Sequence, residues 1–154
     1  MRTGDGQRKP PAIAMRPATL DDYAFALALY LNSTKPLLTR IGRWDEERIV
    51  SRFKRAFKVE QVQIICVDGN DIGWTHIADS ADKIALEQIH LVSCFCEKGI
   101  GTMLIKNLLT YAKSQHKPVT LNVMRGNRAL ELYKRLGFRV TGHDLDKLQM
   151  ISRA

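Results

Sequence analysis

Two glycines separated by one residue, Gly99 and Gly101, stand where an alternating apolar segment ends and a helical segment begins. Glycine is the least favourable residue after proline in a helix interior. Its missing Cβ, however, lets an anion approach the unpaired N–H groups and partial positive charge of a helix N-terminus. The spacing therefore admits two interpretations, an ordinary turn or a cradle for phosphate. It is not the dinucleotide fingerprint, because Leu104 replaces the third glycine, and no P-loop lysine follows.

A second helix start, at Asn127, follows the next strand along the chain. A strand, a helix and a strand in succession form a βαβ crossover, whose two strands must be parallel. Both helix starts then lie at the carboxyl ends of parallel strands, where such units bind ligands. One polyanionic ligand could contact both glycines and Asn127, with positive charge supplied by Lys98, Arg125 and Arg128.

The hydrophobic periodicity predicts the elements that position these residues. Strands are expected at 13–17, 61–67, 71–78, 84–92 and 119–124, with two more in 139–152 around a turn at Gly142. Helices are expected at about 19–31, 44–57, 99–116 and 127–138, with 32–42 as a loop or broken helix. We therefore expect an α+β fold with a mixed, mostly antiparallel sheet of about seven strands, one parallel βαβ pair and about four flanking helices.

Composition sets the broad class. The 154 residues are 45% apolar, enough for one domain with a core, which we place at 13–154. Residues 1–12, rich in Gly and Pro, are predicted to be a disordered tail. An apolar run of about 18 residues and a signal-like leader are both missing, so we expect no membrane association. Three cysteines, an odd number, favour a reducing, cytoplasmic location.

The balance of 24 basic and 16 acidic residues gives a net charge of +8. Such a charge suits a polyanionic partner, or it reflects solvated helix faces. A basic nucleic-acid-binding or regulatory module is therefore a second class of function. The sequence makes nucleic acid unlikely, because it has no run of aromatics interleaved with basic residues and no recognition-helix pattern.

The two motifs together resemble the signatures of the GNAT superfamily, the acetyl-CoA-dependent N-acetyltransferases. Residues 96–101, Cys-Glu-Lys-Gly-Ile-Gly, resemble the family motif Gln/Arg-x-x-Gly-x-Gly/Ala. The family's second motif is a short helix with Asn, then Tyr, then a Leu-Gly-Phe end, and it is similar to the segment with Asn127, Tyr133 and residues 136–138. The segment MRPATLDD at 15–22 resembles the family's first strand and helix start. The resemblance covers about residues 13–152. Cys96 departs from the family's Gln/Arg, although the family's loop holds pyrophosphate mainly through backbone N–H groups.

The resemblance implies transfer of the acetyl group of acetyl-CoA to a primary amine by direct attack, without a metal. The acceptor is expected to be a small-molecule amine, with a protein N-terminus or lysine as the alternative. A homodimer is possible. The cofactor-binding residues that the resemblance implies are Ile89, Leu91, Cys96, Glu97, Lys98, Gly99, Gly101, Thr102, Asn127 and Tyr133. Of these, Ile89 and Leu91 would pair with the pantetheine arm through their backbone.

Glu87 is our candidate base, because it is a charge in a mostly apolar strand just before the glycines. Partial burial would raise its pKa and make it a better proton acceptor; the alternative is a solvent-facing residue. His90 is the rival base, but strand parity places it on the opposite face. By resemblance, Tyr133 is the general acid; the alternative is a packed core tyrosine. Asn127 could equally be a helix N-cap.

Three other groups have both a structural and a functional interpretation. Cys94, Cys96 and His90 could suggest a metal, but they are poorly spaced for zinc. Trp44 and Trp74 could line an acceptor pocket or pack in the core. The acids at 45–47 could attract a cationic amine, although a helix N-terminus explains them better.

Overall fold

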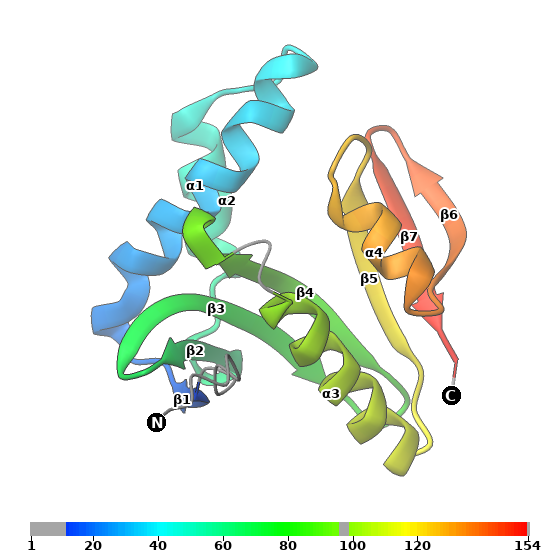
Figure 1. The fold of residues 1–154 in the computed structure, drawn as a ribbon. Coiled ribbons are helices and arrows are strands. Elements are labelled where there is room, and N and C mark those ends of the chain that lie inside the picture. Colours follow the sequence, from blue (N-terminus) through cyan, green and yellow to red (C-terminus); the bar gives the residue numbers. More distant parts are fainter. Residues whose placement is uncertain (1–11, 96–98, 154) are drawn as a thin grey trace, which may run out of the picture.

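The computed structural model describes residues 12–95 and 99–153, so the predicted tail lies outside the described residues except for Ala12. Seven strands form one sheet in the order β1-β2-β3-β4-β5-β7-β6 (Figure 1). Their bounds are β1 Ile13–Pro17, β2 Val62–Val67, β3 Asn70–Asp79, β4 Ile84–Leu91, β5 Val119–Met124, β6 Arg139–Asp144 and β7 Lys147–Ser152. The helices are α1 Tyr23–Arg40, α2 Glu46–Ala56, α3 Ile100–Ser114 and α4 Ala129–Arg135. The predicted α+β class, strand number and helix number are confirmed.

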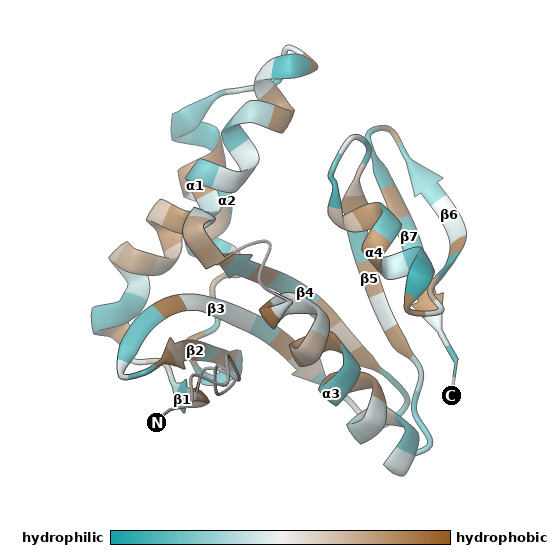
Figure 2. Cartoon of the chain, viewed as in Figure 1, coloured by the Kyte–Doolittle hydropathy of each residue, from teal (hydrophilic) through white to brown (hydrophobic). Residues whose placement is uncertain are grey.

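The helices cover opposite faces of the sheet. Ile64 of β2 packs in a cluster with residues of α1 and α2, whereas the next residue, Ile65, packs in another cluster with Ile100 of α3. Adjacent residues of a strand point to opposite faces, so α1 and α2 lie on one side and α3 on the other. Hydrophobic residues run along β5 whereas β6, the outer strand, is mostly hydrophilic (Figure 2).

One pair of neighbouring strands is parallel, β4 with β5, as the βαβ pattern predicts. Their ladder contains three residue pairs and ends with Leu86 opposite Leu121. Beyond that pair the two strands diverge, so that they lie close together at one end and far apart at the other (Figure 1). The sheet is thereby opened in the middle, at the carboxyl ends of the two parallel strands.

Two local predictions were wrong. Segment 32–42 is not a loop, because α1 continues through Pro36 as far as Arg40. A proline removes one helical hydrogen bond and can kink a helix without ending it. The last turn is at residues 145–146 rather than at Gly142, which lies inside β6 next to an irregularity in its pairing with β7.

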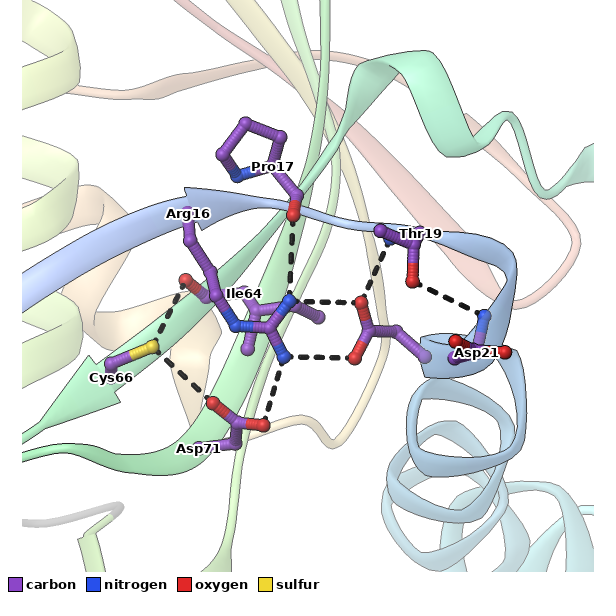
Figure 3. Close-up of polar contacts among 8 residues, drawn as sticks. Arg16, Pro17, Thr19, Asp21, Ile64, Cys66 and Asp71 are labelled. Carbon is purple, nitrogen blue, oxygen red and sulfur yellow. Dashed lines mark hydrogen bonds and ion pairs between the residues drawn. The ribbon is translucent and has the colours of Figure 1, made fainter.

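The start of the first helical segment is anchored by an ionic cluster (Figure 3). The Arg16 guanidinium donates two hydrogen bonds to Asp22, of 2.9 and 3.0 Å, and a third to Asp71 of β3. Thr19 and Asp22 form a reciprocal capping box around a short 3-10 turn. The cluster ties β1, β3 and the entry to α1 together. None of the helices in the described ranges is long and apolar enough to cross a membrane.

Candidate active site

A cavity of about 230 Å³ begins where β4 and β5 stop pairing. Its walls come from both strands, from α1 and α2, and from the segment around α4. Of the residues that the sequence marked, Glu87, Ile89, Asn127 and Tyr133 all line it. The tertiary structure therefore brings both candidate catalytic side chains to one crevice.

Glu87 occupies an irregularity of β4. His76 of β3 pairs with Gln88, but the next residue of β3, Ile77, pairs with Leu86. Glu87 is thus the additional residue of a β-bulge, which interrupts the alternation of side chains along the strand. Bulges of this kind occur next to active sites, where they redirect a side chain.

The bulge corrects the prediction that His90 faces away from Glu87. Glu87 and Gln88 line the same cavity as Trp74 and His76, and the tilted rings of His90 and Trp74 are in contact, with centroids 5.1 Å apart. All of them therefore lie on the α1/α2 face. Strict alternation fails because one extra residue shifts the parity of every position after it.

Glu87 is exposed, so the partial burial expected from the sequence is not found. It nevertheless lines the crevice cavity and the larger neighbouring one. An exposed carboxylate at the mouth of a cavity can accept a proton from an incoming amine and pass it to solvent. Its role as base remains a prediction.

His90 is placed less well for that role. Burial lowers the pKa of His90 to about 4, so the imidazole is neutral at pH 7 and a weak proton acceptor. Its Nε2 lies 2.7 Å from Gln88 Oε1, and its ring also meets Tyr30 edge-on. These contacts indicate that His90 forms part of the wall of the crevice rather than acting as the base.

Tyr133 is almost completely buried in the core cluster that includes Phe138, and it also lines the crevice cavity. Both interpretations of this residue are therefore compatible with its position. Burial raises the pKa of Tyr133 to about 12, because the phenolate would lack water to solvate it. The hydroxyl thus stays protonated throughout the neutral range, as a general acid must.

The two glycines differ in what the fold demands of them. Gly99, the N-cap of α3, has φ 77°, a left-handed conformation that favours glycine. Gly101 has no such requirement, and among the described residues a Cβ added there would meet only Leu91 Cδ1, at 3.8 Å. Open space therefore lies beside the N–H groups of the first turn, which includes Thr102. The left-handed backbone conformation explains Gly99, whereas Gly101 is free to serve a ligand.

The remaining implied cofactor residues divide into two groups. Cys96, Glu97 and Lys98 lie outside the described residues. Ile89 and Leu91 are partly buried, and both pair with β3, at Thr75 and Gly73. On the other side of β4, the ladder with β5 has already ended. This edge is where the sequence resemblance places the pantetheine arm.

Asn127 combines the two roles considered for it. Its Oδ1 accepts a hydrogen bond of 2.9 Å from the Ala129 N–H, at the start of α4. The same residue lines the crevice cavity. Its side chain thus satisfies an N–H at the start of α4, although the N-cap position itself is Arg128; contact with a cofactor stays a prediction.

The structure also shows where the other groups with two interpretations lie. Asp45 accepts a hydrogen bond from the Arg48 N–H at the start of α2, which supports the capping explanation of these acids. Trp74 is a core residue that also lines a cavity, and Trp44 lines another. In the ranges described, no group of three or more His, Cys, Asp or Glu is arranged to hold a metal ion; Cys96 lies outside those ranges.

Sequence reasoning missed two cations that converge on the crevice. Arg52 of α2 and Lys147 of β7 both line its cavity, although they are far apart in the chain. In the sequence, Arg52 is one of several basic residues that a solvated helix face explains. Lys147 belongs to a terminal strand that contains no motif. No local signal could have identified either residue.

Comparison with known proteins agrees with this geometry. The model of the acetyltransferase (GNAT) domain matches residues 58–140, more than half of the chain. The PaiA N-acetyltransferase of Thermoplasma acidophilum, solved with coenzyme A, is 21% identical, with a TM-score of 0.74 over 93% of this chain and 99% of that one. A GNAT family acetyltransferase of Elizabethkingia anophelis, solved with acetyl-CoA bound, is 16% identical, with a TM-score of 0.64 over 92% and 98%. Ard1 of Thermoplasma volcanium is 18% identical, with a TM-score of 0.65 over 93% and 98%.

No curated protein sequence matches the chain. The domain match shows that the chain belongs to the GNAT family of acetyltransferases. The family predicted from the sequence is confirmed, and with it the enzyme class. The solved structures confirm the fold. Acetyl-CoA, the predicted co-substrate, agrees with the family and with the coenzyme A or acetyl-CoA present in two of these neighbours.

Proposed function

We propose that this protein transfers the acetyl group of acetyl-CoA to the primary amine of a small molecule by direct attack. The observation that carries the proposal is the opening between β4 and β5, where Glu87 and Tyr133 line one cavity. Acetyl-CoA supplies the acetyl group as a thioester. The neighbours solved with coenzyme A or acetyl-CoA share this fold.

The residues of this chain fit such a co-substrate. The first turn of α3 offers N–H groups without intrahelical acceptors, and Gly101 leaves room for a phosphate against them. The edge of β4 that no longer pairs with β5 after Leu86 would present backbone groups to the amide-containing pantetheine arm, as in the addition of a strand. One of these N–H groups would also polarise the thioester carbonyl.

Two side chains then move protons. Glu87 accepts a proton from the amine, directly or through water, so that the nitrogen lone pair can form the new C–N bond. When the C–S bond breaks, the Tyr133 hydroxyl donates its proton to the departing sulfur. The high pKa of Tyr133 keeps that proton available at neutral pH. Solvent restores both groups after the transfer.

The proposal is tested by calorimetric titration with coenzyme A, followed by thiol release from acetyl-CoA across a panel of small amines. We expect coenzyme A to bind and at least one small amine to be acetylated faster than peptides with free N-termini or lysines. Acetylation of peptides alone would favour the protein-modifying alternative. A folded protein without affinity for coenzyme A that binds nucleic acid with a steep salt dependence would support the regulatory class instead.

A further inference from the structure

A second cavity, of about 420 Å³, lies beside the crevice on the α1/α2 face. Tyr30, Phe53 and Trp74 form its aromatic wall. It shares Glu87, Arg52 and Lys147 with the crevice cavity, so these three residues stand at the junction of the two. A molecule in the second cavity can therefore reach the position where the proposed reaction takes place.

The charges at this junction are unequal. The charged residues that line the crevice cavity are Arg52, Lys147 and Glu87. The second cavity has the same three and adds Lys58. Among the residues that the structure describes, two or three cations thus face a single carboxylate. His76 and His90, which line one or other cavity, add no charge at neutral pH, because burial lowers the pKa of each.

Neither of the two cations at the junction, Arg52 and Lys147, is held by a carboxylate of the described residues. Within 12–95 and 99–153, neither has a salt bridge, whereas Arg43 nearby pairs with Asp146 at 3.1 Å. The two cations come from α2 and β7, elements on the two sides of the opening. A guanidinium and an ammonium that approach from opposite walls match the two oxygens of one carboxylate.

These cations are badly placed to hold the phosphates of coenzyme A. The turn at Gly99 and Gly101 starts α3, which packs on the face opposite to α1 and α2. Arg52 belongs to α2. Its positive charge therefore lies on the other face of the sheet from the glycines.

A third cavity, of about 630 Å³, continues from the junction toward the turn between β6 and β7 and also includes Arg52 and Lys147. Its charges are mixed, because Asp45, Asp144 and Asp146 line it too. It therefore shows no clear preference for a ligand of either charge, unlike the first two cavities.

We propose that the acceptor is an amine that carries a carboxylate, such as an amino acid, with its carboxylate held by Arg52 and Lys147 and its amine directed to Glu87. This inference rests on the proposed function and names its substrate class. A polyamine has the opposite pattern, because its second ammonium group would face Arg52, Lys58 and Lys147. Charge repulsion then selects against polyamines while the carboxylate amine is attracted at both ends.

The test compares amines matched in size. Thiol release from acetyl-CoA is measured with L-alanine and L-alaninamide, with L-glutamate and L-glutamine amide, and with spermidine. We expect kcat/KM to be roughly tenfold or more higher for each carboxylate than for its amide, because a hydrogen bond to a charged group contributes that much. Arg52→Gln and Lys147→Gln are expected to raise KM for the carboxylates roughly tenfold, with KM for the amides unchanged. Arg55→Gln and Lys54→Gln, on the same helix but outside the cavities, control for the lost charge.

Each outcome of these measurements supports or contradicts the assignment of a carboxylate-bearing acceptor. Equal or faster turnover of the amides or spermidine overturns the inference, and so does an unchanged KM in Arg52→Gln and Lys147→Gln. A protein that binds coenzyme A but acetylates none of the carboxylate amines also overturns it. These failures leave the proposed acetyl transfer standing, whereas a folded protein without affinity for coenzyme A contradicts the proposed function itself.

Discussion

Leu86 of β4 faces Leu121 of β5 in the last pair of the parallel ladder, and the residue that follows Leu86 is the additional residue of a β-bulge. The end of pairing and the bulge thus coincide. Together they open the sheet and turn Glu87 toward the opening.

The first prediction separates the two glycines. Gly101→Ala is expected to keep or slightly raise the free energy of unfolding, because alanine is the better helix former by about 1 kcal/mol and its Cβ has room. The same methyl would occupy the space proposed for a phosphate, so we expect the Kd for coenzyme A to rise roughly tenfold, or about 1.4 kcal/mol. Calorimetry and thermal unfolding measure the two effects.

Gly99→Ala is the matched control. Its positive φ makes any side chain strained, so we expect a loss of about 1 kcal/mol in unfolding free energy. An unaltered affinity of Gly101→Ala for coenzyme A would show that Gly101 is only a part of the turn.

The second prediction concerns Tyr133→Phe. If its hydroxyl donates a proton, kcat should fall by roughly 10²-fold, while the ring and its edge-on contact with Phe138 remain. Because the pKa of Tyr133 is about 12, the wild type should show no loss of activity from this group between pH 7 and pH 10. Wild-type kcat in Tyr133→Phe would mean that the residue only packs.

The third prediction tests Glu87 as base. Glu87→Gln removes the proton acceptor but keeps the size of the side chain, and we expect kcat/KM to fall by roughly 10²-fold. Glu131→Gln removes an exposed carboxylate of α4 that lies outside the crevice, so it should leave kcat/KM unchanged. Equal rates for the two variants would identify Glu87 as an ordinary solvent-facing residue.

The fourth prediction follows from His90. In the unfolded chain this imidazole binds a proton below about pH 6.5, whereas in the folded protein it does so only below about pH 4. The unfolded state therefore binds more protons between these values, and the unfolding free energy should fall as the pH drops from 6.5 to 4. Chemical denaturation at several pH values measures this slope.

His90→Gln should weaken the slope without abolishing it, because burial also lowers the pKa of His76. His143→Gln, at an exposed position of β6, should keep it. A slope that is the same in wild type and His90→Gln would contradict the assignment.

The fifth prediction concerns Asp22, whose pKa is lowered below its usual value by hydrogen bonds from Arg16. A carboxylate with a lowered folded pKa adds stability above its unfolded pKa of about 3.9 and loses it as the pH falls further. Asp22→Asn should cost about 1.5–3 kcal/mol at pH 7 and reduce the loss of stability below pH 4. Asp21→Asn, the exposed neighbour, should change neither quantity; a similar loss in both variants would argue against the cluster.

Much of the fold was predictable because its determinants are local. Alternation identified the strands, and a strand, helix and strand in sequence required β4 and β5 to be parallel. Segment 32–42 was predicted wrongly because a proline inside a helix and a proline that ends one look alike in sequence. The turn after β6 was misplaced because Gly142 resembles a turn residue, whereas it lies at an irregularity inside the strand.

The site was predictable only where a motif marks it. Gly99, Gly101, Asn127 and Tyr133 belong to two spaced patterns, and the family match confirms the class of protein that these patterns indicate. Strand parity misplaced His90, because a bulge leaves no signal in the pattern of residues. The sequence likewise contains no signal that Glu87 is exposed.

The sequence by itself determined the family, the order of the elements and the motif residues, because each depends on neighbours within a few positions. Only the tertiary structure decided that the sheet opens after Leu86 and that Arg52 and Lys147 meet Glu87 at one junction. The physical reason is that these relations depend on how strands pair and diverge. Residues distant in the chain meet only when the packed sheet brings their elements together.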